Sequence, residues 1–381
     1  MAYGLAGRCF CHHGEVAIFR RATASANLKV PGPRPRPIVT QNAGVLPLAA
    51  LLPPPVVWVF AGGGSHGAVQ LGSLQAISET DAHADSVMGT SAGALTGAVI
   101  AEDPRSAVNR LAYLWQDLDF TDIVRGGWTS LVSPTTFSGV SLASDEGERA
   151  SLRAVFVARD FSDLVLPFVA IATDAHTGQP TLLHRGDLLE ALLASSAVPG
   201  VFPPVHRNGR WYIDGLASAN LPASIAMRNG AGSILAFDTG SGARKPVGPS
   251  VTAVVPAINE LLSAQQRVSS LTLAADVVPV VYLPTPTGLA GTLSFRDSID
   301  MARDAYVMGQ KFLIDLVAQY GGAQLAPGLY ARPDAFGVTQ PAVARVLRPV
   351  LADVPEPTGL LPEQTAGESL GDAAAWTGAL R

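Results

Sequence analysis

The chain has 381 residues, of which 48% are hydrophobic and 15% are charged, a composition that suits a globular protein with much buried sheet and excludes a disordered chain. Its net charge of −5 divides unevenly, because residues 1–55 carry six Lys or Arg and one Glu (+5), which leaves −10 for the rest. An acidic body argues against a nucleic-acid binder.

The first segment, residues 1–55, contains the run VPGPRPRPIV and no sustained periodicity, which predicts a disordered N-terminal extension. The chain's two cysteines lie here, in CFCHH at residues 9–13, but their spacing fits no tetrahedral zinc pattern. Three consecutive prolines interrupt the apolar run at 45–60, so neither a membrane span nor a signal peptide is predicted. We therefore expect a cytoplasmic protein. Peripheral contact with a membrane and the oligomeric state are left open.

From residue 56 onward, strand and helix patterns alternate, which predicts an α/β fold with a mostly parallel central sheet covered by helices. The expected strands cover 56–60, 86–89, 166–173, 233–238 and 277–284. The expected helices cover 68–77, 92–101, 103–118, 187–198, 251–272 and 297–320, the third with Asp103 as its N-cap. We expect residues 56–325 to form one domain with a helical C-terminal part. Residues 326–381, rich in Pro, Ala and Gly, are expected to form a loosely structured tail.

A glycine-rich loop joins the first expected strand to the first expected helix. It contains Gly62, Gly63, Gly64 and Gly67, in the order G-x-G-x-x-G that is typical of dinucleotide-binding sites. The same loop is a row of backbone N–H groups at a helix N-terminus, which suits any anion, including the oxyanion of an ester under attack. The loop alone therefore leaves two chemistries open.

A second motif follows one strand later, where Gly89-Thr90-Ser91-Ala92-Gly93 reads G-x-S-x-G between a strand and a helix. This is the context of a nucleophile elbow, in which the serine hydroxyl is exposed on a sharp turn. The alternative is an ordinary tight strand–helix turn in which the serine caps the helix and has no catalytic role. A dinucleotide site needs an acidic residue after the second strand, and Asp85 precedes that strand instead. An oxyanion role explains both turns together, whereas a dinucleotide role explains one.

A serine nucleophile requires a base, and histidine is the usual choice. The order Ser91–Asp174–His206 stays formally open, but His206 flanks the expected hairpin turn RNGR at 207–210. His66, inside the glycine loop, is a second histidine candidate. Asp214, at the end of the expected strand WYI, is the better candidate. Its reference pKa of about 4 makes it a poor base for an alcohol, so burial and oxyanion stabilisation would have to close the gap.

These three motifs, in this order, resemble the patatin-like phospholipase family. The connecting stretches ASSAVPGVFPPV, DGLASANLP and IATDAHTG resemble it too, and the resemblance extends from about residue 56 to about 240, with a fainter echo to 320. It implies a three-layer α/β/α fold and a Ser–Asp dyad that hydrolyses acyl esters of lipids without histidine, metal or nucleotide cofactor. It further implies Ser91 as nucleophile, Asp214 as base, and an oxyanion hole formed by Gly62, Gly63, Gly64 and Gly67.

Two positions depart from the family pattern. Many members have Lys or Arg where this chain has His66, and most have Gly or Ala where it has Leu216. Neither departure removes a catalytic group. Two other functions stay open: a nucleotide-binding protein that uses the glycine loop for phosphate, and an idle scaffold that binds lipid.

The stretch 125–141 raises a separate expectation. It is rich in Gly and Ser and carries Trp128, Leu131 and Phe137. We expect it to be a mobile flap over the acyl site. The alternative is that its apolar side chains are buried in the core.

Overall fold

The computed structural model describes residues 45–117, 149, 152–199, 201–242, 251–289, 297–336 and 341–351. The chain divides into two units after Gly44, and all of these residues belong to the second unit. The CFCHH segment, the expected flap at 125–141 and residues 352–381 lie outside the described residues. Within the described part, no helix is long and apolar enough to cross a membrane.

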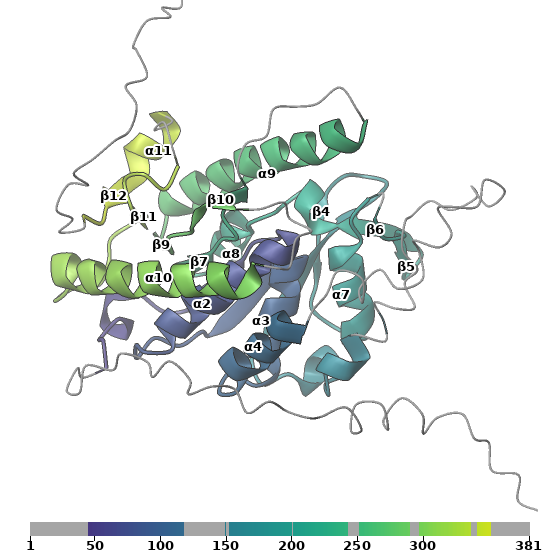
Figure 1. Ribbon diagram of the computed structural model, residues 1–381, viewed down its shortest axis with the longest axis horizontal. Coiled ribbons are helices and arrows are strands. Elements are labelled where there is room, and N and C mark those ends of the chain that lie inside the picture. Colours follow the sequence, from purple (N-terminus) through teal and green to yellow (C-terminus); the bar gives the residue numbers. More distant parts are fainter. Residues whose placement is uncertain are drawn as a thin grey trace, which may run out of the picture. The chain divides into compact units, whose positions relative to one another are not determined.

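In this part of the chain ten strands form one sheet, in the order β12-β11-β9-β7-β1-β2-β3-β6-β5, with β4 paired to β3 beside this path (Figure 1). Every pairing from β12 to β3 is parallel, whereas β4, β5 and β6 pair antiparallel. The strands are β1 Val56–Phe60, β2 Ser86–Thr90, β3 Phe168–Asp174, β4 Pro180–Leu183, β5 Val205–Arg207, β6 Arg210–Asp214, β7 Ser233–Phe237, β9 Pro279–Tyr282, β11 Gly328–Ala331 and β12 Leu347–Pro349. Two short strands, β8 Ser241–Gly242 and β10 Thr287–Leu289, pair separately.

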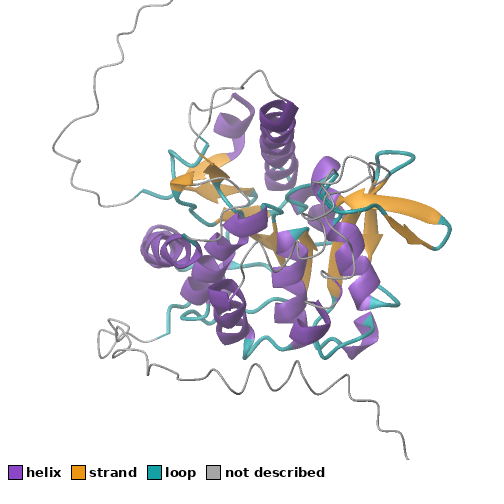
Figure 2. Cartoon of the chain, turned by 45° about the vertical axis from the view of Figure 1, so that its right-hand side comes forward, coloured by secondary structure: helices purple, strands orange, loops and turns teal. Residues whose placement is uncertain are grey.

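Helices cover both faces of the sheet, as Figure 2 shows. They are α2 Gly67–Ile77, α3 Ala92–Glu102, α4 Ala107–Asp117, α7 Leu188–Ser196, α8 Ala223–Arg228, α9 Val251–Ala275, α10 Ser298–Tyr320 and α11 Pro341–Val346. Alternate residues of β1 separate the two faces. Trp58 and Phe60 pack in one buried cluster with α2, α3, α4, α7 and α10, and Val57 and Val59 pack in another with α8, α9 and α11. The predicted three-layer α/β/α fold with a mostly parallel sheet is confirmed.

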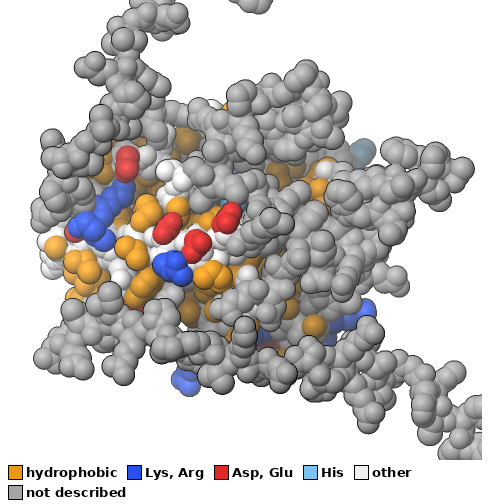
Figure 3. All heavy atoms as spheres, viewed as in Figure 1, with side chains coloured by type: hydrophobic (Ala, Val, Ile, Leu, Met, Phe, Trp, Pro, Cys, Tyr) orange, Lys and Arg blue, Asp and Glu red, His pale blue; other side chains and the backbone are white. Residues whose placement is uncertain are grey.

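Helix α2 is buried almost all around because α10 crosses it closely. A Cβ added at Gly72 would lie 1.9 Å from the carbonyl oxygen of Ala302, so only glycine allows this approach. The outer face of α10 carries exposed Val307 and Ile314 near charged Lys311. Figure 3 shows apolar and charged side chains intermixed on the face of the molecule that it views.

The described structure corrects three expectations from sequence. Leu48, Leu51 and Leu52 are buried, so the fold begins before residue 56. Strands β11 and β12 extend the sheet beyond residue 325; they are only four and three residues long, too short for a composition rich in Pro and Gly to reveal. Helix α4 begins at Ala107, because Asp103 caps a separate turn through the N–H of Arg105. The hairpin turn expected between β5 and β6 is confirmed, with Asn208 and Gly209 both at positive φ.

Candidate active site

The strand–turn–helix geometry around Ser91 is sharply bent. Ser91 lies between β2 and α3 with φ 55° and ψ −125°, a backbone conformation that residues other than glycine rarely adopt. A Cβ on Gly89 would lie 2.2 Å from the Gly93 carbonyl oxygen, and a Cβ on Gly93 would lie 2.5 Å from that of Ala61. Both flanking glycines are therefore required by space. The turn exposes 6% of Ser91.

A buried serine holds this turn in place. The backbone N–H of Ser91 donates to Ser195 Oγ (3.0 Å), and Ser195 Oγ donates in turn to the carbonyl oxygen of Ile171 (2.6 Å). Ser195 comes from α7 and Ile171 from β3, so the two elements packed around the elbow fix its backbone. The Ser91 hydroxyl takes no part in these bonds.

Strand β6 brings Asp214 to the elbow. Thr90 of β2 pairs with Ile171 of β3, and Asp214 pairs with the next β3 residue, Ala172. Strand β4 occupies the other edge of β3 over this stretch, so β2 and β6 share one edge. Asp214 thus stands in the ladder where β2 would have continued with Ser91. A Cβ on Gly215 would lie 2.2 Å from the Ile171 carbonyl oxygen, which explains the glycine after the aspartate.

The Asp214 carboxyl group is 0% exposed. Its Oδ1 accepts the N–H of Leu216 (2.8 Å), while Oδ2 has no hydrogen-bond partner among the described residues. Burial raises the pKa of Asp214 to about 7, against the opposing effects of the Ser91 side chain and the Leu216 N–H. The Ser91 hydroxyl is thus near the carboxyl group without a hydrogen bond of standard geometry to it, as is common in sites without substrate.

Two of the four loop glycines use their N–H groups within the protein. Gly62 N–H donates to Asn220 Oδ1 (2.9 Å), and Gly67 N–H donates to the Gly64 carbonyl oxygen. Gly63 and Gly64 are half-buried, and no described residue accepts from their N–H groups. A Cβ on Gly62 would lie 3.0 Å from Ser91 Cβ, so the loop passes directly beside the elbow. Among the four loop glycines, Gly63 and Gly64 therefore have the amide donors that are free within the described residues.

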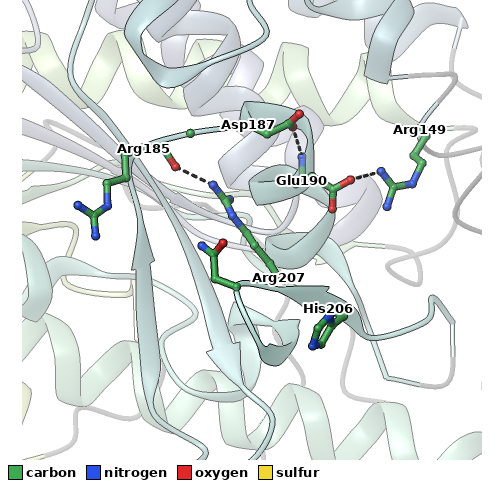
Figure 4. A pocket seen from close by; sticks show the side chains of 8 residues that line it. Arg149, Arg185, Asp187, Glu190, His206 and Arg207 are labelled. Carbon is green, nitrogen blue, oxygen red and sulfur yellow. Dashed lines mark hydrogen bonds and ion pairs between the residues drawn. The ribbon is translucent and has the colours of Figure 1, made fainter.

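The two histidine candidates occupy different surroundings. His66 is buried at the end of the turn η2 Gly64–His66. His206 is exposed, and its ring packs against that of Trp211 with centroids 4.8 Å apart. His206 lines a hollow of about 880 Å³ together with Arg149 and Arg207 (Figure 4), and Ser91 is not part of that lining.

The triad that the sequence left open is not assembled. Asp174 accepts the N–H groups of His176 and Thr177 (2.9 and 3.0 Å) and forms an ion pair with Arg210 (2.9 Å). These bonds lower the pKa of Asp174 to about 2. Asp174 therefore closes a turn and holds the β5–β6 hairpin, and His206 packs on Trp211 instead.

The acidic residue considered for a dinucleotide also lies elsewhere. Asp85 Oδ2 accepts the backbone N–H of Val56 (2.7 Å), at the start of β1. The glycine loop follows the other end of that strand. Asp85 therefore lies at the amino end of the parallel strands, whereas a ribose held by the loop would lie at their carboxyl end.

Residues 58–227 match the family model for patatin-like phospholipase. The resemblance to this family that was predicted from the sequence is confirmed over these residues. The chain is 33% identical over 189 residues to patatin-like phospholipase domain-containing protein 7 of Rattus norvegicus, in an alignment that covers 49% of this chain and 14% of that protein. It is 29% identical over 186 residues to neuropathy target esterase sws of Drosophila melanogaster, covering 48% and 13%. The chain thus spans a small part of these relatives' length. Among solved structures, VipD from Legionella pneumophila is similar with a TM-score of 0.42 and 13% identity, covering 75% of each chain.

Three residues that contact the site were not singled out from the sequence. Ser195 and Asn220 lie within family-like stretches, but nothing in the pattern shows which atoms they contact. Thr239 donates its hydroxyl to the Gly62 carbonyl oxygen (3.1 Å). It is the second residue after β7, and a polar residue just past the end of a parallel strand next to β1 is a signal that could have found it.

Proposed function

We propose that this chain is a serine acyl hydrolase of lipid esters, with Ser91 as nucleophile and Asp214 as its general base. The observation that carries this proposal is the fully buried carboxyl group of Asp214 beside the bent Ser91 turn, with its pKa raised to about 7. A carboxylate with this pKa accepts a proton at neutral pH far better than an ordinary aspartate does.

In the proposed mechanism Asp214 takes the proton from Ser91 Oγ, and the oxygen attacks the ester carbonyl carbon. The N–H groups of Gly63 and Gly64, together with that of Ala92, stabilise the oxyanion. Asp214 then returns the proton to the leaving alcohol, which leaves an acyl group on Ser91. Asp214 then takes a proton from water, which attacks the acyl carbon; the bond to Ser91 Oγ breaks, Asp214 returns the proton to that oxygen, and the fatty acid departs. Gly62 and Gly67 shape the loop in this account and donate no hydrogen bond to the substrate.

The substrate class is supported by the names of the relatives, one a phospholipase domain-containing protein and one an esterase. A lipid ester is presented in a membrane or micelle, so peripheral contact with such a surface is part of the proposal. The nucleotide-binding alternative is less well supported, because the N–H of Gly62 is already bonded to Asn220 and Asp85 lies at the start of β1.

The test combines active-site labelling with turnover. Wild type should react with a fluorophosphonate at Ser91 and hydrolyse at least one member of a panel of phospholipids, neutral glycerides and short esters. Ser91→Ala should do neither, while Ser78→Ala, which changes an exposed serine at the end of α2, should do both. Binding of a labelled nucleotide without any labelling or turnover would replace this function with the nucleotide-binding one. Lipid binding without labelling or turnover would indicate an idle scaffold.

A further inference from the structure

The peptide group between Gly62 and Gly63 is positioned by a residue that follows β7. Its carbonyl oxygen, on Gly62, accepts the hydroxyl of Thr239 (3.1 Å). On the preceding peptide, the N–H of Gly62 donates to Asn220 Oδ1 (2.9 Å). Thr239 and Asn220 are both buried, so these bonds are shielded from competing water. The backbone at the start of the loop is therefore held at two consecutive peptide groups.

The bond from Thr239 has a directional consequence. A trans peptide group is planar, and its carbonyl and its N–H point in opposite directions. Fixing the Gly62 carbonyl toward Thr239 therefore fixes the Gly63 N–H toward the opposite side. That N–H has no acceptor among the described residues, and its loop passes beside Ser91. Rotation of this peptide would exchange a hydrogen-bond donor for a carbonyl oxygen, which repels an oxyanion.

Thr239 is itself firmly anchored. Its backbone N–H donates to Asp238 Oδ1 (2.7 Å). Asp238 is buried, and it also accepts from Arg267 Nη1 (2.9 and 3.1 Å) and from the Tyr282 hydroxyl (2.6 Å). These partners come from α9 and β9. The Thr239 backbone thus belongs to a charged, buried network that does not depend on the glycine loop.

The contact also explains why residue 63 is glycine. A Cβ at Gly63 would lie 2.3 Å from Thr239 Oγ1. Any side chain at this position would therefore displace the threonine hydroxyl. The Thr239 hydroxyl can therefore occupy its place only because residue 63 has no side chain.

We infer that Thr239 is a positioning residue for the oxyanion hole, whose hydroxyl orients the Gly62–Gly63 peptide so that the Gly63 N–H faces the ester oxygen. Thr239 touches neither the substrate nor Ser91 in this account. The inference rests on the proposed hydrolase function and adds to it a residue outside the dyad and the loop.

The first test compares Thr239→Val, which keeps the shape and removes the hydroxyl, with Thr239→Ser, which keeps the hydroxyl. Loss of a single oxyanion donor typically costs about 10²–10³-fold in kcat. A misdirected donor should lower kcat about 10- to 100-fold and leave KM nearly unchanged. Thr239→Ser should restore most of the activity. Thr272→Val is the matched control, because Thr272 is also buried and donates to a backbone carbonyl, that of Val268 in α9.

A second measurement separates orientation from general disturbance. Sulfur is a weaker hydrogen-bond acceptor than oxygen, so a thionoester gains less from the oxyanion hole than the matched oxygen ester. In Thr239→Val the ratio of oxygen-ester to thionoester turnover should fall about tenfold, and the pH profile set by Asp214 should not move. Equal losses on both substrates, or Thr239→Val activity equal to that of Thr272→Val, would overturn the inference. If the valine variant does not fold, Thr239→Ala is measured in the same way.

The outcome for wild type distinguishes this inference from the proposed function. A wild type that neither hydrolyses an ester nor reacts with fluorophosphonate removes the proposed function and this inference with it. An active wild type with an unaffected Thr239→Val removes the inference alone.

Discussion

Asp214 occupies the position along the edge of β3 that Ser91 would have taken had β2 continued, although the two residues are far apart in the chain. Thr90, just before the serine, pairs with Ile171, and Asp214 pairs with Ala172. The chain turns away at Ser91 because α3 begins there, and β6 enters the ladder from the opposite direction. Two strands that run in opposite senses thus deliver a hydroxyl and a carboxyl group to one place, with the carboxyl group wholly buried.

This relationship predicts that the two side chains act as one unit. Asp214→Asn should lower turnover about 10²–10⁴-fold, a typical effect of losing a general base. Because members of one catalytic unit are not additive, the double variant with Ser91→Ala should be hardly worse than either single variant. His206→Gln should cost less than about tenfold, since His206 is exposed and packs on Trp211. Steady-state kinetics of folded variants checks this. Near-normal turnover of Asp214→Asn with an inactive His206→Gln would require a histidine triad instead.

The rate should depend on pH through the same carboxyl group. Only deprotonated Asp214 accepts a proton, and burial raises its pKa to about 7. Turnover should therefore rise with pH through a limb near 7 and reach a plateau above it. The mid-point belongs to Asp214 if it is unchanged in His66→Gln and His206→Gln. A profile flat from pH 5 to 8 would contradict the raised pKa.

Stability should show the same titration with the opposite sign. The folded protein holds the Asp214 proton up to about pH 7, whereas an unfolded aspartate releases it near pH 4. The stabilising contribution of the protonated group is thus complete below about pH 4 and is lost as pH rises toward 7. Asp214→Asn has no such proton, so the variant should gain stability relative to wild type over this range. Chemical denaturation at several pH values measures the difference. If the free energies of unfolding of wild type and Asp214→Asn changed in parallel with pH, the prediction would be refuted.

The close crossing of α2 and α10 gives a graded prediction on stability. Gly72→Ala places a methyl group 1.9 Å from the Ala302 carbonyl oxygen, which forces the helices apart and should cost about 1–3 kcal/mol or more. Gly309→Ala, at the same crossing, places a methyl group 3.0 Å from Ala76 Cβ, and the nearest backbone atom, Ser73 Cα, is 4.0 Å away. Its cost is partly offset by the higher helix propensity of alanine, about 1 kcal/mol. Denaturant midpoints should rank wild type and Gly309→Ala above Gly72→Ala, and the reverse order would show that the helices do not cross this closely.

Local patterns predicted much of the fold and the place of both motifs. The run VVWVF is apolar throughout, and all five residues of β1 are buried. The elbow could be predicted because its glycines lie within a few residues of Ser91. The raised pKa of Asp214 could not be predicted from the local sequence, because it depends on burial by distant strands. The same holds for the amides of the glycine loop. Gly62 donates to Asn220, and no local pattern shows that this N–H is already occupied.

The edge that β2 and β6 share on β3 also has a consequence for the order of synthesis. Ser91 is synthesised before α3, whereas Asp214 follows β3, β4, α7 and β5. Because synthesis runs from the N-terminus, a nascent chain that stops short of β6 contains Ser91 but lacks Asp214. In the proposed mechanism such an intermediate has no base. In that mechanism hydrolysis therefore begins only after the chain has been made past β6.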